Sequence, residues 1–286
     1  MLSQQINIKL NKKRLHEIFF IRDNPFIWVG IRKKIFSSKN SKYSEVSEEM
    51  VLGILVKEYN LNSFNIFTYI KKSKSSIKDL FNKIDYSCSI DLYFPYPPLN
   101  NNDETFIVND HYWQNIASSS KSLDKDEEHF RIFSIKALKK YILPNTVVYD
   151  PACSSGIFLS HISKNYPLCK CIGSDKSIKM INIAKNKIKH VFLNDANNLK
   201  TENLHCDVII CRFLNHEVIT EEIAIKIMNK LLLILNSKGI IVIFGHTPVT
   251  FDVLKFADDK GLKVLNSIGK LYKNNIFQYY IIMKKD

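Results

Sequence analysis

The sequence contains few glycines, few cysteines and no long apolar run, and each shortage excludes a class of protein. Its 286 residues include 8 Gly, 8 Pro and 6 Cys. The cysteines show no C-x-x-C spacing, which favours reduced thiols over a disulfide scaffold or a zinc site. No window approaches the roughly 20 apolar residues of a membrane span, and the N-terminus shows no signal-like stretch. We therefore expect a cytoplasmic protein without membrane contact.

Acidic residues are scarcer than basic ones, with 28 Asp and Glu against 41 Lys and Arg and a net charge of +13. Such an excess invites a nucleic-acid interpretation. Residues 1–140, however, carry 22 basic and 16 acidic groups, and residues 141–286 carry 19 and 12. This even distribution indicates no basic arm, so we do not expect nucleic acid as the partner.

Glycine is rarest in the first half of the chain, where only Gly30 and Gly53 precede residue 150. The other six lie where turns between alternating strands and helices need them. Residues 93–102, rich in proline and asparagine, cannot continue a helix or a central strand. We therefore predict two domains: a mainly helical N-terminal domain, 1–105, that caps the site and binds the acceptor, and an α/β domain, 106–286.

Hydrophobic spacing predicts the elements of both domains. In the first domain it predicts helices at 45–59, 63–70 and 77–84. In the second it predicts a long amphipathic helix from Asp124 to Pro144. The strands that follow are predicted at 147–149, 171–174, 191–193, 207–211, 240–244, 264–268 and 277–283. Helices are predicted between them at 157–165, 177–189, 221–235 and 251–260. This order predicts an open, mostly parallel sheet that ends in an antiparallel hairpin.

The turn after the first strand of the second domain consists of small residues. It contains Asp150, Ala152, Cys153, Ser154 and Gly156. In open α/β sheets, ligands bind beyond the carboxyl ends of the strands. A turn of small residues lets a ligand approach the backbone, and the helix that follows offers free N–H groups. We therefore predict a ligand site at this turn.

Two further carboxylates follow the next two strands. Asp175 can accept both hydroxyls of a ribose, and Asp195, which precedes Ala196, can accept an exocyclic adenine amine. Three acids at the ends of three consecutive strands predict a nucleoside site. The turn lacks the G-x-G-x-x-G spacing that a dinucleotide pyrophosphate requires. Because S-adenosylmethionine has no phosphate, its loop tolerates Ala and Ser, and we predict this molecule as co-substrate, without a metal.

The segment from Asp150 to Gly156 resembles motif I of the class I S-adenosylmethionine-dependent transferases in its D-P-A-C-x-S/T-G variant. The resemblance covers roughly residues 110–286. It implies a Rossmann-like, seven-stranded class I methyltransferase fold. It also implies that Asp150 faces the methionine amine, Asp175 the ribose and Asp195 the adenine.

Two loops resemble those of one smaller group within this class. Residues 212–218 and 244–249 are similar to the isonocardicin synthase-like group. Membership would imply transfer of the 3-amino-3-carboxypropyl group of S-adenosylmethionine to an oxygen or nitrogen nucleophile, with release of methylthioadenosine. We therefore expect a small-molecule acceptor.

The choice between the methyl group and the longer arm depends on the groups that hold the methionine carboxylate and amine. Arg212 is the candidate for the carboxylate because a guanidinium binds it bidentately, and a salt bridge to a nearby acid is the alternative. Asn215, Tyr112 and Trp113 are candidates to complete this binding, with packing or a lid as the alternative for the two aromatic residues.

Two histidines are candidates for the general base that removes a proton from the acceptor. His246 follows the fifth strand and is the first choice, and His216 is the second. Histidine suits this role because its charge changes near neutral pH. A structural role is the alternative for each.

Other functions stay open from the sequence. The same site would serve small-molecule O- or N-methylation, which releases S-adenosylhomocysteine. A different class is a nucleic-acid-binding module built on two short helices of the first domain, or a DNA-modifying enzyme. Adenine methyltransferases of DNA hold the flipped base with an N-P-P-Y-like motif after the fourth strand, and residues 211–217 contain none. The sequence leaves the oligomeric state undetermined.

Overall fold

The computed structural model describes residues 5–32, 44–84, 89–109, 111–112, 115, 117, 125, 127–199, 204–271 and 275–286. It divides into two compact units. The first comprises Met1–Phe106, Thr247–Val249 and Asn266–Tyr279. The second comprises Ile107–His246, Thr250–Leu265 and Tyr280–Asp286. Among the helices of these described ranges, none is both long and apolar enough to cross a membrane.

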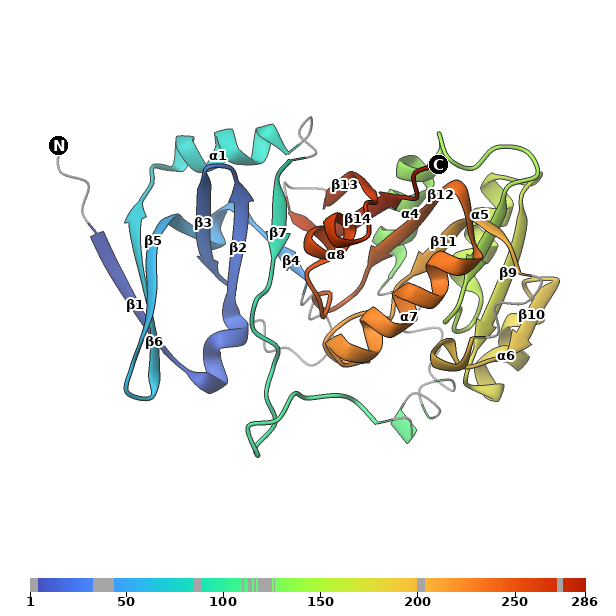
Figure 1. The fold of residues 1–286 in the computed structure, drawn as a ribbon, viewed down its shortest axis with the longest axis horizontal. Helices are drawn as coiled ribbons and strands as arrows, with labels where there is room; N and C mark the ends of the chain where they lie inside the picture. Colours follow the sequence, from blue (N-terminus) through green and yellow to red (C-terminus); the bar gives the residue numbers. More distant parts are fainter. Residues whose placement is uncertain are drawn as a thin grey trace. The chain divides into compact units, whose positions relative to one another are not determined.

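The first unit is built on a sheet of six strands in the order β1-β6-β5-β3-β2-β7, and every neighbouring pair is antiparallel (Figure 1). The strands are β1 (Gln5–Asn11), β2 (Ile18–Asp23), β3 (Phe26–Ile31), β5 (Val51–Leu61), β6 (Phe64–Lys71) and β7 (Asp91–Tyr93). The remaining elements are the short strand β4 (Glu45–Val46), the 3-10 turns η1 (Lys12–Glu17) and η2 (Glu48–Met50), and α1 (Lys74–Lys83).

The two faces of this sheet carry separate cores because strand side chains alternate between faces. In β2, Phe19 and Ile21 belong to one cluster, which also contains Leu80 and Phe81 of α1. Ile18 and Phe20 belong to the other cluster. Helix α1 thus covers one face, and its residues Ile77, Leu80 and Phe81 supply the helix side of that core.

The prediction that residues 1–105 are mainly helical is wrong. Of the three predicted helices, only 77–84 corresponds to a helix, α1; 45–59 lies mostly in β5 and 63–70 in β6. The two strands pair along their length and turn at Asn62, whose φ of 55° suits a tight turn. Gly53 allows close pairing, since a Cβ there would lie 2.0 Å from the Ile70 carbonyl oxygen. Long-range pairing outweighed a local spacing that imitates a helix.

This correction also removes the two-helix arrangement on which the nucleic-acid-binding alternative rested. That alternative needs a helix at 63–70 packed beside one at 77–84. Residues 64–71 instead form β6, which lies between β1 and β5 in the sheet.

The second sheet has the order β10-β9-β8-β11-β12-β14-β13, and β4 pairs antiparallel with β14. The strands are β8 (Val147–Asp150), β9 (Lys170–Asp175), β10 (His190–Leu193), β11 (Cys206–Cys211), β12 (Leu235–Phe244), β13 (Lys263–Lys270) and β14 (Ile276–Met283). The helices are α4 (Glu128–Leu138), α5 (Ile157–Asn165), α6 (Ile178–Ala184), α7 (Glu221–Ile234) and α8 (Val253–Asp259), and the 3-10 turn η4 spans Ala196–Asn198. Every strand and helix predicted after residue 124 is present with shifted ends.

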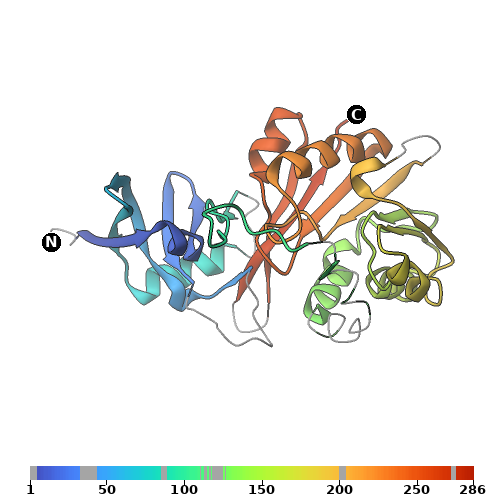
Figure 2. The ribbon, with the colours of Figure 1, turned by 90° about the horizontal axis from the view of Figure 1, so that it is seen from below.

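Helices cover both faces of the part of this sheet that belongs to the second unit. Figure 2 shows α7 and α8 on one side and α4 on the other. Phe244 at the end of β12 lies 5.4 Å from Phe130 of α4 and 5.6 Å from Phe158 of α5, measured between ring centroids. Because β8 to β12 pair in parallel, their carboxyl ends lie along one edge of the sheet. This edge holds the predicted site.

Candidate functional site at the ends of the parallel strands

The turn that follows β8 crosses over the end of β9. Asp150 ends β8 opposite Gly173 of β9, and the Cys153 N–H donates to the Ser174 carbonyl at 2.8 Å. The Ala152 N–H returns to Asp150 Oδ1 at 3.0 Å. Gly173 permits this crossing, since a Cβ there would meet the Cys153 Sγ at 2.9 Å. The turn is therefore packed on the strand that supplies the second predicted carboxylate.

The Asp175 side chain connects this turn to the end of β9 through hydrogen bonds. Its Oδ2 accepts the Ser154 N–H at 2.9 Å and its Oδ1 accepts the Ser177 N–H at 2.8 Å. Burial raises the pKa of Asp175, and the two N–H groups oppose that rise. Each carboxylate oxygen has a second lone pair, so these contacts leave acceptor capacity for two hydroxyls.

Two residues of the turn adopt left-handed backbone conformations. Ser154 has a φ of 51° and Gly156 a φ of 74°. Gly156 is also the N-cap of α5, and a Cβ on it would lie 3.0 Å from the Cβ of Ala184. The glycine therefore serves two purposes, because it allows the left-handed conformation and it lets α5 begin close against α6.

Asp195 and Ala196 follow β10 beside this turn. Leu193 of β10 pairs with Asp175, and the Asn194 N–H donates to the Asp175 carbonyl at 3.1 Å. Asp195 is the exposed N-cap of η4, where its Oδ1 accepts the Asn197 N–H at 2.9 Å, whereas Ala196 is buried. The three acids predicted from sequence thus follow three adjacent strands of the sheet.

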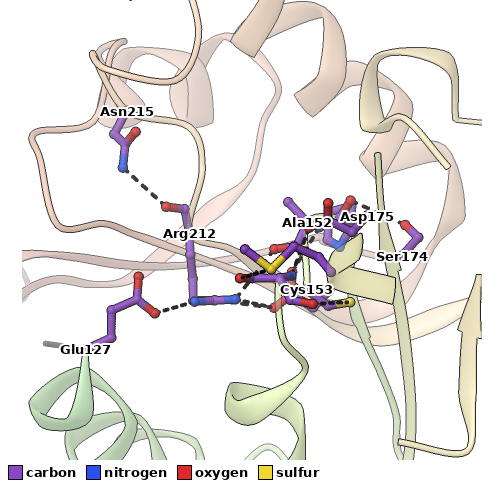
Figure 3. A network of polar contacts seen from close by, with 11 residues as sticks. Glu127, Ala152, Cys153, Ser174, Asp175, Arg212 and Asn215 are labelled. Atoms are coloured by element: carbon purple, nitrogen blue, oxygen red, sulfur yellow. Dashed lines mark hydrogen bonds and ion pairs between the residues drawn. The ribbon is translucent and has the colours of Figure 1, made fainter. Parts of the chain in front are cut away.

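Arg212, just after β11, lies between two carboxylates (Figure 3). Its Nε and Nη2 both donate to Asp150 Oδ2 at 3.3 Å, and its Nη1 donates to Glu127 Oε2 at 2.5 Å. The guanidinium carbon also lies 5.0 Å from the ring centroid of Phe158. Arg212 therefore forms the salt bridge that was the alternative to carboxylate binding.

Burial controls the electrostatics of this cluster. The Asp150 side chain is 0% exposed and that of Arg212 is 8% exposed. Burial raises the pKa of Asp150 to about 6, although Arg212 and the Ala152 N–H both lower it. Burial also opposes the charge on Arg212, but the carboxylates of Glu127 and Asp150 outweigh it and raise the pKa of Arg212. Arg212 therefore stays charged, while Asp150 can change its charge in mildly acidic solution.

Glu127 is the residue of this cluster that the sequence prediction missed. It lies within the helix predicted from Asp124 to Pro144 and is the N-cap residue of α4. Its ion pair with Arg212 joins residues 85 positions apart in the sequence. No local motif marks such a contact, so only the tertiary structure reveals it.

The other predicted residues occupy different surroundings. Asn215 is buried, and its Nδ2 donates to the Arg212 carbonyl at 3.3 Å. Its Oδ1 is also buried and accepts no hydrogen bond within the described part of the chain. His216 is 5% exposed and His246 is half-buried. Tyr112 is 49% exposed, and Trp113 lies outside the described residues.

Backbone contacts fix the loop that carries Arg212, Asn215 and His216. The Leu214 carbonyl accepts the Thr250 N–H at 3.0 Å, and the Glu217 carbonyl accepts the Val108 N–H at 2.8 Å. These contacts join the segments after β11 and after β12 to the segment that precedes α4. The loop that carries the second candidate base, His216, is therefore fixed by backbone hydrogen bonds to two other segments.

The chemistry of the donor set fits S-adenosylmethionine. Asp150 offers a buried carboxylate to an ammonium group, Asp175 retains two acceptor sites for a ribose, and the Oδ2 of Asp195 accepts no hydrogen bond from the described residues. Among those same residues, no three His, Cys, Asp or Glu side chains are placed to hold a metal ion.

Comparison with known proteins found a matching domain family, a similar curated protein and similar solved structures. The methyltransferase domain family matches residues 148–239. Isonocardicin synthase from Nocardia uniformis subsp. tsuyamanensis is 25% identical over 244 residues, which is 85% of this chain and 80% of that protein. The plantazolicin methyltransferase BpumL, solved in complex with SAH, is 16% identical; the match covers 62% of this chain and 96% of that one, with a TM-score of 0.45. An S-adenosylmethionine-dependent methyltransferase from Aquifex aeolicus is 19% identical over 58% of this chain and 97% of that one, with a TM-score of 0.44.

The sheet order, the turn after β8 and the methyltransferase-domain match together define the class of the protein. The chain is a class I S-adenosylmethionine-dependent methyltransferase-like protein with the Rossmann-like fold of that class. It is therefore an S-adenosylmethionine-dependent transferase.

Proposed function

We propose that the protein transfers the 3-amino-3-carboxypropyl group of S-adenosylmethionine to an oxygen or nitrogen atom of a small molecule. The observation that carries this proposal is the similarity to isonocardicin synthase over 85% of the chain. Residues 107–286 are too few to hold a 244-residue match, so the similarity extends into Met1–Phe106. It therefore includes more than the methyltransferase domain at residues 148–239.

In the proposed reaction, the acceptor attacks the γ-carbon of the methionine arm from the side opposite sulfur. The bond between sulfur and the γ-carbon breaks, its electron pair stays on sulfur, and methylthioadenosine leaves. The sulfonium centre already activates this carbon, so the protein contributes mainly placement. Binding of the amine by Asp150 and of the carboxylate by Arg212 would hold the arm, with Asn215, Tyr112 and Trp113 as further predicted contacts.

The acceptor must also lose its proton, and we propose His246 as the base, with His216 as the second candidate. A neutral imidazole would take the proton from a phenol or a ring nitrogen as the new bond forms. The acceptor-binding role of residues 1–105 is a prediction of the same kind.

A second candidate function is methylation of the same acceptor atom. It is favoured by the match of residues 148–239 to the methyltransferase domain family. The same cofactor residues would serve it, but the methionine arm would turn so that the methyl carbon faces the acceptor. The product would then be S-adenosylhomocysteine.

The experiment that separates the two candidates follows the fate of both groups. The protein is incubated with S-adenosylmethionine labelled with ¹⁴C in the carboxyl group and ³H in the methyl group, together with a panel of phenols, amines and imidazoles. The proposal predicts ¹⁴C in the acceptor and ³H in methylthioadenosine. Tritiated acceptor, with S-adenosylhomocysteine as the sole nucleoside product, would show methylation instead.

A further inference from the structure

We propose that Glu127 is a placeholder for the carboxylate of S-adenosylmethionine: its side chain binds Arg212 and gives up this position when the co-substrate enters. This inference rests on the proposed function only in taking Arg212 as the group that receives the methionine carboxylate. It adds a residue that no sequence motif indicates and a specific exchange of partners at the guanidinium.

The contacts of Arg212 show why an exchange is needed. Of its three nitrogens, Nε and Nη2 are directed at Asp150 and Nη1 at Glu127, while Nη2 also lies 3.5 Å from the Ala152 carbonyl. A guanidinium has five N–H donors in a fixed planar fork. The two carboxylates take three of these donors and the Ala152 carbonyl lies near a fourth, so one N–H, on Nη1, is left and no parallel pair is available to a third carboxylate. One of the present acceptors must therefore leave.

Glu127 is the acceptor that can leave at least cost. Asp150 is fully buried at the end of a strand, and the Ala152 carbonyl belongs to the backbone of the turn. The Glu127 side chain is 24% exposed and stands on the N-cap residue of a helix. Figure 3 shows it reaching Arg212 from α4, on the side opposite the Ala152 turn. Rotation of this side chain would return its charge to water.

The exchange also keeps the number of carboxylates around Arg212 constant. Removing one partner of a buried ion pair leaves an uncompensated charge, which is strongly unfavourable. With Glu127 in place, Arg212 contacts two carboxylates, and a ligand carboxylate in the position of Glu127 restores the same number. Co-substrate binding therefore requires no further desolvation of Arg212.

In this exchange, Glu127 competes with the ligand carboxylate for Arg212 and competes with no other group of the ligand. Substitution Glu127→Gln replaces the charged acceptor of Arg212 with a neutral amide, which removes the attraction between two opposite charges although the guanidinium can still donate a hydrogen bond. A ligand carboxylate should then bind Arg212 more easily. A ligand without a carboxylate should gain nothing, because it does not displace the side chain at position 127.

Calorimetric titration with three ligands tests this exchange. The ligands are S-adenosylhomocysteine, its decarboxylated analogue S-adenosyl-3-thiopropylamine, and methylthioadenosine. We expect Glu127→Gln to tighten binding of S-adenosylhomocysteine about five- to tenfold, which corresponds to replacing a carboxylate acceptor of the guanidinium with an amide acceptor. Binding of the other two ligands should stay within about twofold of the unsubstituted protein. The matched control is Glu128→Gln, which removes the next acid of the same helix and should change none of the three affinities.

Each other outcome contradicts the proposal. Equal gains for all three ligands would indicate a general charge effect. Weaker binding of both amine-bearing ligands would assign Glu127 to the ligand amine, and an unchanged affinity for S-adenosylhomocysteine would leave Glu127 a structural partner only. Thermal unfolding of both variants verifies that they are folded. Because these titrations contain no acceptor, they do not depend on which group is transferred, and a failure of the transfer proposal would appear only in the products.

Discussion

Arg212 donates from both Nε and Nη2 to the same oxygen of Asp150, at 3.3 Å each, and neither side chain is more than 8% exposed. Asp150 ends β8, and Arg212 follows the neighbouring strand β11. The pair therefore joins the ends of two central strands across the centre of the predicted co-substrate site. Its burial makes both the stability of the protein and its binding of ligands sensitive to charge at this point.

Substitution Arg212→Met should destabilise the protein, because it leaves the Asp150 carboxylate buried without a cation. We expect the free energy of unfolding at pH 8 to fall by about 3 kcal/mol, the order found when one partner of a buried pair is removed. At pH 5 the loss should be smaller, because protonated Asp150 needs no cation. Urea unfolding at both pH values measures this, and an equal loss at both would show that Asp150 is not the cause.

Binding of S-adenosylhomocysteine should weaken as the pH falls below about 6. Burial raises the pKa of Asp150 to about 6, so the carboxylate that is predicted to bind the amine is lost by protonation below that value. Affinity should fall about tenfold per pH unit in the acidic range, as for loss of a single charge. Methylthioadenosine, which has no amine, is the control ligand, and its affinity measured by calorimetry should stay nearly constant. A parallel decline of both ligands would assign the effect to another group.

Substitution Gly156→Ala should cost more stability than Gly261→Ala. Both glycines have positive φ, 74° and 64° respectively, so both changes place a Cβ in a left-handed conformation at about 1 kcal/mol or more. A Cβ at Gly156 also meets Ala184 at 3.0 Å, whereas a Cβ at Gly261 has nothing within 4 Å. We expect a total of about 2 kcal/mol at Gly156 by chemical denaturation. Weaker co-substrate binding is expected only for Gly156→Ala, and equal effects of the two changes would contradict the proposed role of the turn.

Substitution Asp175→Ala should weaken binding of S-adenosylhomocysteine at least about a hundredfold, because two hydrogen bonds to a charged acceptor are lost. The change also releases the Ser154 and Ser177 N–H groups, so some loss of stability is expected. Asp207→Ala is the matched control, since Asp207 accepts the Val147 N–H at 2.8 Å and the Asn236 side chain at 2.7 Å, in the same manner but at the start of β8. It should lose stability but keep its affinity. Retained binding in Asp175→Ala would refute the ribose assignment.

The second domain was predictable because its local signals and its tertiary contacts agree. The buried run 207–211 reads as a central strand, and the acidic residues Glu221 and Glu222 mark the first turn of a helix that Thr220 caps. In parallel sheets each strand is covered by helices on both faces, so strand and helix alternate in the sequence as they do in space. Asp150, Asp175 and Asp195 could be placed for the same reason, since the first two end their strands and Asp195 follows two residues after the end of the next.

The first domain was not predictable in this way. Residues 51–61 carry apolar groups at spacings compatible with either a helix or a strand. Their conformation is decided by pairing with β3 on one side and β6 on the other. Such pairings lie outside any local window. The prediction of a helix there was therefore wrong. The helix predicted at 77–84 corresponds to α1 at residues 74–83, one face of which packs on the sheet.

The sequence by itself determined the class of chemistry, because a small-residue turn and three carboxylates after successive strands require only local order and a parallel sheet. Tertiary structure alone decided how the site is charged. It brought Glu127, from the start of α4, to within 2.5 Å of Arg212 and buried Asp150 against the same guanidinium. Electrostatic energies depend on distance and burial, and neither follows from the order of residues in the chain.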